Sequence, residues 1–254
     1  MRARLRELAR DAWIQHERAE REVVPHLVRP SIPILFFGDS ERFAASPLRV
    51  ITVGLNPSRE EFPRAAPFLR FPAAEGASGR DPDRYLASLD AYFRTAPYTG
   101  WFNPSFEPLL RGLGSSYYDG ALSAALHTDL CSPLATDPTW SRLAPPEQAL
   151  LEPAGRRLWH ELVEALQPDV VLISVARRRL SKVEFPLTEP ASVIDTVDGP
   201  GRMRPYRIEA FRHALGSGRV PLFVFGQASQ TPFGSISGVE KRRIGARILE
   251  LLDA

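Results

Sequence analysis

Runs of β-branched and apolar residues recur along the chain, and most of them end in glycine, proline or polar residues. Continuous apolar runs of this length predict buried strands, because strands covered on both faces do not alternate between apolar and polar positions. The predicted strands are residues 34–37, 49–53, 125–130, 169–175 and 220–225. A further β excursion is expected at residues 192–197.

Segments with a helical spacing of apolar residues lie between these strands. Residues 3–22 place Leu5 and Leu8 on one face, which predicts a surface helix. The other predicted helices are 83–94, 105–113, a segment near 118–124, 153–166, 206–215 and 239–252. The segment 63–83, rich in Pro, Gly and Ala, predicts a long loop, and a second, aromatic loop is expected at 98–104.

Strands and helices that alternate in this way predict an α/β fold. We expect a mainly parallel central sheet of about four strands, with helices on both faces. No repeat and no low-complexity linker divides the chain. The sequence therefore predicts a single domain over residues 1–254, with residues 1–30 as an N-terminal helical extension packed on it.

Composition excludes several classes of protein. The chain of 254 residues carries 32 Lys and Arg against 30 Asp and Glu, and a net charge of +2 does not by itself indicate a nucleic-acid binder. No apolar run approaches the roughly 20 residues that span a bilayer, and the N-terminus lacks the apolar core of a signal peptide. We expect a cytoplasmic protein that does not associate with membranes.

The sequence also lacks the common motifs of α/β enzymes. It has no Gly-x-Gly-x-x-Gly after a strand, no phosphate-binding P-loop and no Gly-x-Ser-x-Gly elbow. Its five histidines are scattered, and the single Cys131 excludes both an internal disulfide and a cysteine-rich zinc site. We therefore expect neither a cofactor nor a metal.

Three of the predicted strands end in unusual polar segments, at residues 54–58, 127–134 and 225–237. The carboxyl ends of parallel strands share one edge of a sheet, where α/β proteins bind ligands. Asn56, between a permissive glycine and a stiff proline, would present its amide outward. We expect the three segments around one cleft, with the aromatic loop as a wall. The alternative for the first segment is a polar β-to-α turn.

Basic residues gather in three places, each after a strand-like segment or its loop. The three groups are Arg177-Arg178-Arg179 with Lys182, Arg202 with Arg204, and Lys241-Arg242-Arg243. They could converge on one edge of the sheet and contact phosphates, or they could be solvated helix faces.

The motif Gly54-Leu55-Asn56-Pro57 and the order of the three segments resemble the uracil-DNA glycosylase superfamily, over roughly residues 33–250. There, a Gly-x-Asn-Pro or Gly-x-Asp-Pro motif follows the first core strand. An aromatic wall, a base-reading residue and a late His-Pro-Ser loop come next. The resemblance implies a monofunctional DNA glycosylase that acts on double-stranded DNA as a monomer. It would flip the target base and leave an abasic site.

The resemblance also implies a role for each matching residue. Asn56 would position the attacking water, and Asp129 would read the base edge. The residues expected to bind the base are Gly54, Leu55, Pro57, Ser58, Trp101, Phe102 and His127. The residues expected to contact DNA are Arg177, Arg178, Ser229, Gln230, Thr231, Phe233 and Ser235. For His127, a hydrogen-bonded core position is the alternative.

The late segment departs from the superfamily, because residues 230–233 read Gln-Thr-Pro-Phe where a His-Pro-Ser motif is usual. The leaving base is therefore not stabilised by that histidine. Phe233 or Ile236 would serve as the apolar wedge, and Ser229 or Ser235 as a phosphate contact. The alternative for this segment is a glycine-rich strand-to-helix turn.

Asp129 stands where superfamily members that act on uracil commonly carry an asparagine. An ionised carboxylate only accepts hydrogen bonds, so it would repel O4 of uracil and bind the exocyclic amine of cytosine. Removal of ordinary cytosine would destroy the host genome. We therefore expect a bulky modified cytosine, such as the glucosylated hydroxymethylcytosine of phage DNA, and a role in anti-phage defence. For Asp129 itself, a loop cap or an ion pair with an arginine is the alternative.

Three other functions remain open at this stage. The first is a repair glycosylase for uracil or another deaminated base. The second is a non-catalytic nucleic-acid-binding module, and the third is a hydrolase of free nucleotides or small molecules.

Overall fold

The computed structural model describes residues 1–22, 24–198, 204–228 and 231–253. Internal contacts divide the chain into two compact units. Unit 1 consists of Met1–Glu41, Leu55–Tyr98 and His127–Leu166, and unit 2 consists of Arg42–Gly54, Thr99–Leu126 and Gln167–Ala254. The single domain over residues 1–254, with its N-terminal extension 1–30, stays a prediction.

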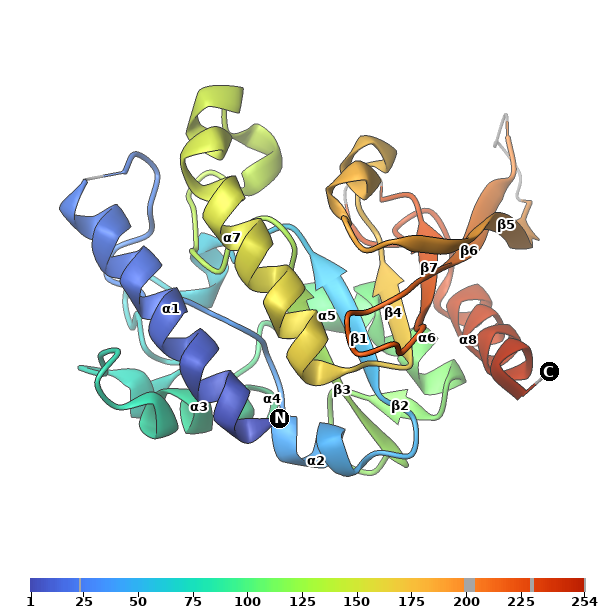
Figure 1. Cartoon of the computed structure of the whole chain (residues 1–254), viewed down its shortest axis with the longest axis horizontal. Coiled ribbons are helices and arrows are strands. Elements are labelled where there is room, and N and C mark those ends of the chain that lie inside the picture. Colours follow the sequence, from blue (N-terminus) through green and yellow to red (C-terminus); the bar gives the residue numbers. More distant parts are fainter. Residues whose placement is uncertain (23, 199–203, 229–230, 254) are drawn as a thin grey trace. The chain divides into compact units, whose positions relative to one another are not determined.

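The protein has an α/β fold with one sheet and helices around it (Figure 1). Across the sheet the strands follow the order β2-β3-β1-β4-β7-β6-β5. Their bounds are β1 Val50–Gly54, β2 Ser115–Ser116, β3 Ser123–Asp129, β4 Val170–Ile173, β5 Leu187–Val197, β6 Tyr206–His213 and β7 Leu222–Gly226. The pairs β2–β3, β1–β4 and β4–β7 are parallel, and β6 is antiparallel to both β7 and β5. The prediction of a mainly parallel sheet is confirmed. The count of about four strands is wrong, because the described residues form seven.

Three apolar strands form the centre of the sheet. Every residue of β1, β4 and β7 is buried. Their Val, Ile, Leu and Phe side chains project from both faces, as is usual for strands that are covered on both sides. Parallel pairing sets Val53 beside Ile173 and Ile173 beside Phe225. The carboxyl ends of the three strands therefore lie at one edge of the sheet.

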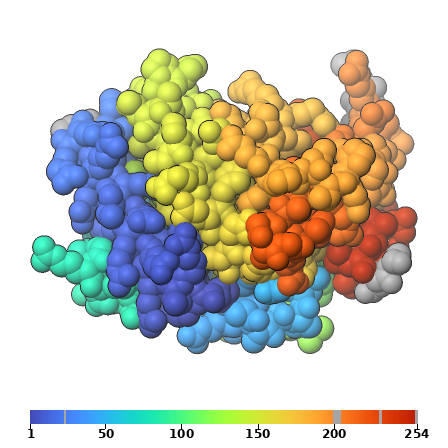
Figure 2. Space-filling model, in the orientation of Figure 1, coloured from blue at the N-terminus to red at the C-terminus, as the bar shows by residue number. Residues whose placement is uncertain are grey.

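Strand β6 overturns a predicted helix at residues 206–215. Ile208 and Ala210 are buried and Arg207 is exposed, and this alternation is that of a strand with one covered face. β6 pairs with β7 on one side and with β5 on the other. β5 contains the predicted excursion at residues 192–197, and the β5–β6 hairpin stands out from the rest of unit 2 (Figure 2).

Unit 1 holds helices α1 (Arg2–Arg21), α3 (Pro82–Asp90), α4 (Tyr92–Thr95) and α7 (Pro145–Leu166). Helix α1 packs against α3 and α7 (Figure 1). Its buried face includes Leu5 and Leu8, which confirms the helix predicted at residues 3–22. The helix predicted at 83–94 is divided in two at Ala91. Within the described ranges, no helix has the length and apolar character needed to cross a bilayer.

Two predicted elements are wrong because the backbone turns. At residues 34–37 Phe37 forms an isolated β-bridge to His127 but no strand develops, and Gly38 follows with a φ of +114°. Near residues 118–124 there is no helix, since Gly120 has a φ of +88° and β3 begins at Ser123. A left-handed glycine favours a turn over a continuing strand or helix.

One predicted loop is helical, and one predicted helix begins earlier than expected. The aromatic loop expected at residues 98–104 is helix α5 (Thr99–Ser105), which is followed by α6 (Glu107–Gly112). Helix α7 begins at Pro145 and carries Pro153 in its interior, at the cost of one backbone hydrogen bond. The shorter helical segments are α2 Ser40–Ala45, η1 Arg59–Glu61, η2 Pro72–Ala74, η3 Trp140–Arg142 and η4 Arg177–Lys182.

Helix α8 (Gly238–Asp253) packs on α6 through glycines. A Cβ atom at Gly245 would lie 2.2 Å from the Leu109 carbonyl oxygen, and one at Gly112 would lie 2.1 Å from the Arg242 carbonyl oxygen. The two helix backbones therefore approach more closely than any other residue type would allow.

We expect Gly245→Ala to destabilise the protein. Alanine favours a helix over glycine, but its methyl group would collide with a backbone oxygen, and overpacking costs about 1–3 kcal/mol. Urea denaturation measures the change, with Gly238→Ala as the matched control, because a Cβ there meets nothing closer than 3.8 Å. A Gly245→Ala protein as stable as the control would contradict the close helix contact.

Candidate active site in unit 1

Two loops of unit 1 are joined by backbone hydrogen bonds. One loop follows β1 and the other follows β3. The Leu55 carbonyl accepts from Cys131 N at 2.8 Å and from Ser132 N at 3.3 Å, and the Pro57 carbonyl accepts from Thr136 N at 3.2 Å. The loop of residues 55–58 is thereby tied to the loop that begins just beyond Asp129.

The amide of Asn56 is fixed within this pair of loops. Its Nδ2 donates to the Leu134 carbonyl oxygen at 3.1 Å and to Thr136 Oγ1 at 2.9 Å. Thr136 Oγ1 donates its own hydrogen to the Pro138 carbonyl at 3.0 Å, so it can only accept from Asn56. Both partners of Nδ2 are therefore acceptors, which fixes the orientation of the amide.

The amide oxygen of Asn56 faces outward. Among the described residues none donates a hydrogen bond to Oδ1, and this atom is not among the enclosed polar atoms that lack a partner. Asn56 is half-buried. It therefore presents a fixed hydrogen-bond acceptor to whatever occupies the site.

Asp129 and His127 lie on the same face of β3, as their spacing of two residues requires. The distance from His127 Nε2 to Asp129 Oδ1 is 3.7 Å, and both side chains are buried. Within the described part of the chain, no hydrogen bond to the Asp129 carboxylate is found, and its oxygens are not among the enclosed polar atoms that lack a partner. The carboxylate is therefore a buried acceptor that a ligand could satisfy.

Glu61, which the sequence does not single out, is a second buried carboxyl group in this unit. Its Oε2 accepts from the Tyr92 hydroxyl at 2.6 Å and lies 3.9 Å from Arg70 Nε. Burial raises the pKa of Glu61 to about 7, the nearby Asp129 carboxylate adds to the rise, and Tyr92 and Arg70 oppose it. Near neutral pH, Glu61 can therefore carry a proton.

Four buried aromatic rings form a cluster that reaches Glu61 through Tyr92 and His127 through Phe37. Tyr92 contacts Phe37 at a centroid distance of 4.8 Å and Phe71 at 5.3 Å, and Phe62 stacks on Phe71 at 5.6 Å. Phe37 also contacts the His127 ring at 5.5 Å. Phe62 and Phe71 lie at the start and in the middle of the long loop that the sequence predicts. The apolar wall close to His127 is thus built from the segments around residues 37, 62–71 and 92.

Helix α7 supports the second loop. A Cβ atom at Gly155 would lie 2.2 Å from the Cys131 carbonyl oxygen, so helix and loop are in direct backbone contact. Trp159 Nε1 also donates to Thr128 Oγ1 at 3.1 Å, between His127 and Asp129 in the sequence. The helix therefore fixes both the end of β3 and the loop that holds Asn56.

The remaining residues of the first motif have structural roles as well. Gly54 ends β1 in unit 2, and Pro57 is buried. Ser58 Oγ accepts from Glu60 N at 3.2 Å and caps the short helix η1. The Leu55 carbonyl is used in the pairing with the second loop.

Trp101 and Phe102 belong to unit 2, on helix α5. Phe102 is buried against Tyr117, with 5.3 Å between ring centroids, and Trp101 is half-buried beside it at 4.8 Å. Their expected role as a stacking wall stays a prediction.

The residues expected to contact DNA differ in where the structure places them. Arg177, Arg178 and Ser235 are exposed in unit 2, and Thr231 is half-buried. Ser229 and Gln230 lie outside the described residues.

Phe233 is buried, contrary to the expectation of an exposed wedge. It lies 5.7 Å from the Phe106 ring in space that Gly226 leaves open, since a Cβ there would lie 2.3 Å from the Phe233 ring. Ile236 is also buried, at 7% exposure. Neither side chain is available at the surface in this structure.

Lys241 is buried, so one of the three basic groups is not fully exposed. Its ammonium donates to the Pro104 carbonyl at 2.5 Å, and burial lowers its pKa to about 8. Arg243 pairs with Asp195 at 2.7 Å. This group is therefore partly structural. Arg202 lies outside the described residues.

Comparisons of the chain with models of known protein families, with curated proteins and with solved structures found no match. The site itself must therefore indicate the chemistry. In the described ranges, no group of three or more His, Cys, Asp or Glu residues could hold a metal ion. What unit 1 offers is a fixed amide oxygen, a carboxylate that accepts, and a carboxyl group that can donate.

We expect Glu61→Gln to change how stability depends on pH. The pKa of Glu61 is 4.5 ordinarily and about 7 in the fold, so between these values the folded protein binds more protons than the unfolded chain. The contribution of Glu61 to the free energy of unfolding is therefore fully present below pH 4.5. It is lost as the pH rises through 7, by up to about 3 kcal/mol.

The measurement is urea denaturation from pH 4.5 to 8, with Glu60→Gln, its exposed neighbour, as the control. Glu61→Gln should remove part of the fall in stability with pH, and Glu60→Gln should not. Identical pH profiles for the two variants and the wild type would show that Glu61 does not hold a proton in the fold.

Proposed function

We propose that the protein is a monofunctional DNA glycosylase that flips a modified pyrimidine out of duplex DNA and hydrolyses its N-glycosidic bond. The observation that carries the proposal is the Asn56 amide, whose Nδ2 is bound to two acceptors while Oδ1 is open. A fixed acceptor suits a water molecule that must attack the sugar of a flipped nucleotide. The resemblance of Gly54-Leu55-Asn56-Pro57 to the uracil-DNA glycosylase superfamily supports the same role and a similar fold.

In the proposed reaction, the bond between the base and the sugar breaks and the base leaves with the electron pair. The sugar passes through an oxocarbenium-like state, as in other glycoside hydrolysis. Asn56 Oδ1 accepts a hydrogen bond from the water, and the water oxygen forms the new bond to the sugar. An amide cannot remove a proton, so the water releases its second hydrogen to solvent or to a nearby carboxylate.

Asp129 is proposed to read the base. Its buried carboxylate accepts no hydrogen bond from the described residues, and the exocyclic amine of cytosine would supply one. A cytosine protonated at N3 would supply a second and would leave as a neutral base. We propose a bulky modified cytosine as the substrate, with glucosylated hydroxymethylcytosine in phage DNA as the leading candidate.

We expect excision from duplex DNA by the wild type and its loss in Asn56→Ala. The substrates are duplexes that contain uracil, 5-hydroxymethylcytosine or glucosylated 5-hydroxymethylcytosine, and alkali reveals abasic sites. Loss of a positioned catalytic contact should lower the rate by at least about 100-fold. Asn103→Ala is the matched control, because Asn103 is exposed on α5 and belongs to unit 2.

Three outcomes would change the proposal. Excision that Asn56→Ala retains would refute the proposed role of the amide. Excision of uracil alone would keep the enzyme class and exclude Asp129 as a cytosine reader. Binding of DNA without abasic sites on any duplex would favour a nucleic-acid-binding module.

We expect Asp129→Asn to move the preference from cytosine-type bases toward uracil. The amide can donate to O4, which the carboxylate repels, and a matched base contact is worth about 1–3 kcal/mol of discrimination. The ratio of the excision rates for the two bases measures the change, and thermal denaturation checks that the variant folds. An unchanged ratio would mean that Asp129 does not contact the base edge.

A further inference from the structure

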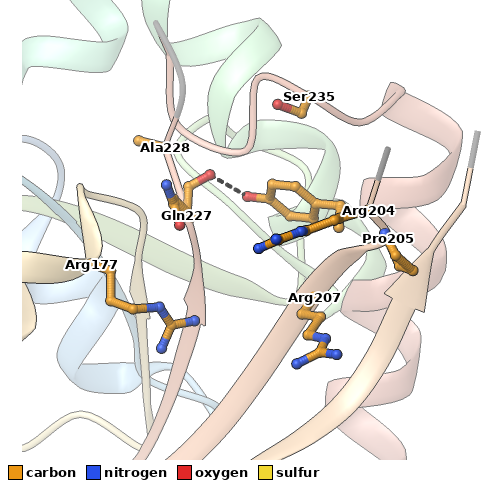
Figure 3. Close-up of a pocket in the computed structure, with 8 residues that line it drawn as sticks. Arg177, Arg204, Pro205, Arg207, Gln227, Ala228 and Ser235 are labelled. Atoms are coloured by element: carbon orange, nitrogen blue, oxygen red, sulfur yellow. Dashed lines mark hydrogen bonds between the residues drawn. The ribbon is translucent and has the colours of Figure 1, made fainter. Parts of the chain in front are cut away.

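Unit 2 contains an open cavity of about 660 Å³ that is lined by arginines. The lining includes Arg177 from the start of η4, Arg204 just before β6, Arg207 at the beginning of β6, and Gln227 and Ser235 from the segment after β7. Figure 3 shows the three guanidinium groups around one space, together with Gln227. We call it the arginine cavity.

The positive charges of the arginine cavity are not neutralised by acidic residues among its described lining. Arg177 pairs with Glu209 at 2.5 and 2.9 Å and lies 5.0 Å from the Phe225 ring, so its guanidinium is held in place. In the described part of the chain, Arg204 and Arg207 have no ion pair, and no Asp or Glu is among the described lining residues. Two positive charges therefore face the cavity without a counter-charge, which favours an anionic ligand.

The arginine cavity also has uncharged polar groups and room for a ligand larger than an isolated ion. Tyr206 donates from its hydroxyl to the Gln227 carbonyl at 2.7 Å, which fixes the segment after β7 (Figure 3). The amide of Gln227 and the hydroxyl of Ser235 add donors and acceptors, and both residues are exposed. The volume lies within the range of about 300–1,000 Å³ that is usual for small-molecule sites.

We infer that the arginine cavity binds a phosphate ester of nucleotide size. The phosphate lies between Arg204 and Arg207, because a guanidinium matches phosphate with two parallel hydrogen bonds. The sugar and base lie toward Gln227 and Ser235. The ester comes from a free nucleotide or from one nucleotide unit of a DNA strand. This inference does not depend on the proposed excision reaction, which involves residues of unit 1.

Binding of defined probes to the full-length protein tests the inference. The probes are deoxycytidine, inorganic phosphate, deoxycytidine 5′-monophosphate and short single-stranded and duplex DNA, measured by calorimetry and by fluorescence anisotropy. The variant is Arg204→Ala/Arg207→Ala. Its control, Arg157→Ala/Arg247→Ala, also removes two positive charges, but from exposed ion pairs on helices.

We expect the wild type to bind the monophosphate or DNA, and the cavity variant to bind it at least about ten-fold more weakly. The control should stay within about two-fold, as exposed ion pairs contribute little. Ser235→Asp, which adds a negative charge at an exposed position, should weaken binding without affecting the fold. Binding of the monophosphate alone would identify a free nucleotide as the source, and binding of DNA alone would identify a strand.

Three results would overturn the inference. They are no saturable binding of any phosphate-bearing probe, deoxycytidine binding as tightly as its monophosphate, and equal losses in the cavity and control variants. Inorganic phosphate binding as tightly as the nucleotide would overturn the nucleotide part of it. None of these results would alter excision or its dependence on Asn56, so the two proposals fail separately.

Discussion

The pairing of the loops after β1 and β3 is the constraint on which the candidate active site depends. The Leu55 and Pro57 carbonyls accept backbone hydrogen bonds from the second loop, and the Asn56 side chain adds two more. Because all of these bonds join one short pair of segments, a shift of either loop would displace the amide. Backbone contact between Gly155 and Cys131 limits such a shift. The position of one amide oxygen is therefore determined by a strand end, a loop and a helix together.

A second constraint concerns Asp129, because burial of an ionised group is costly unless donors compensate it, and no described residue donates to this carboxylate. Glu61, also buried, relieves the repulsion by holding its own proton near neutral pH. A buried carboxyl group whose pKa is raised toward neutrality in this way is a feature of sites that bind or transform polar ligands.

Whether an element could be predicted depends on whether local sequence or pairing with distant segments determines it. β1, β4 and β7 were predictable because a strand buried on both faces leaves a continuous apolar run in the sequence. β6 was not, since Tyr-Arg-Ile-Glu-Ala-Phe-Arg-His has apolar residues that suit a period of either two or 3.6. Only pairing with its neighbours, which is not a local property, decides between them.

The candidate site shows the same limit. Asn56 and Asp129 could be chosen because polar residues at strand ends indicate ligand binding, whatever surrounds them. Glu61 could not, because Arg59-Glu60-Glu61 reads as a solvated charge run and its burial depends on Tyr92 and the aromatic rings. Phe233 was expected at the surface, but the missing side chain of Gly226, seven residues earlier, admits its ring to the interior. Both positions depend on contacts that local sequence does not encode.

The two proposed sites differ in how solvent acts on them, and this makes their contributions separable. Arg204 and Arg207 are exposed, so dissolved ions screen them over a Debye length of about 8 Å at physiological ionic strength. Asp129 and Glu61 are buried, and their interactions are screened far less. Added salt should therefore act mainly on phosphate binding and hardly on steps that depend on the buried groups.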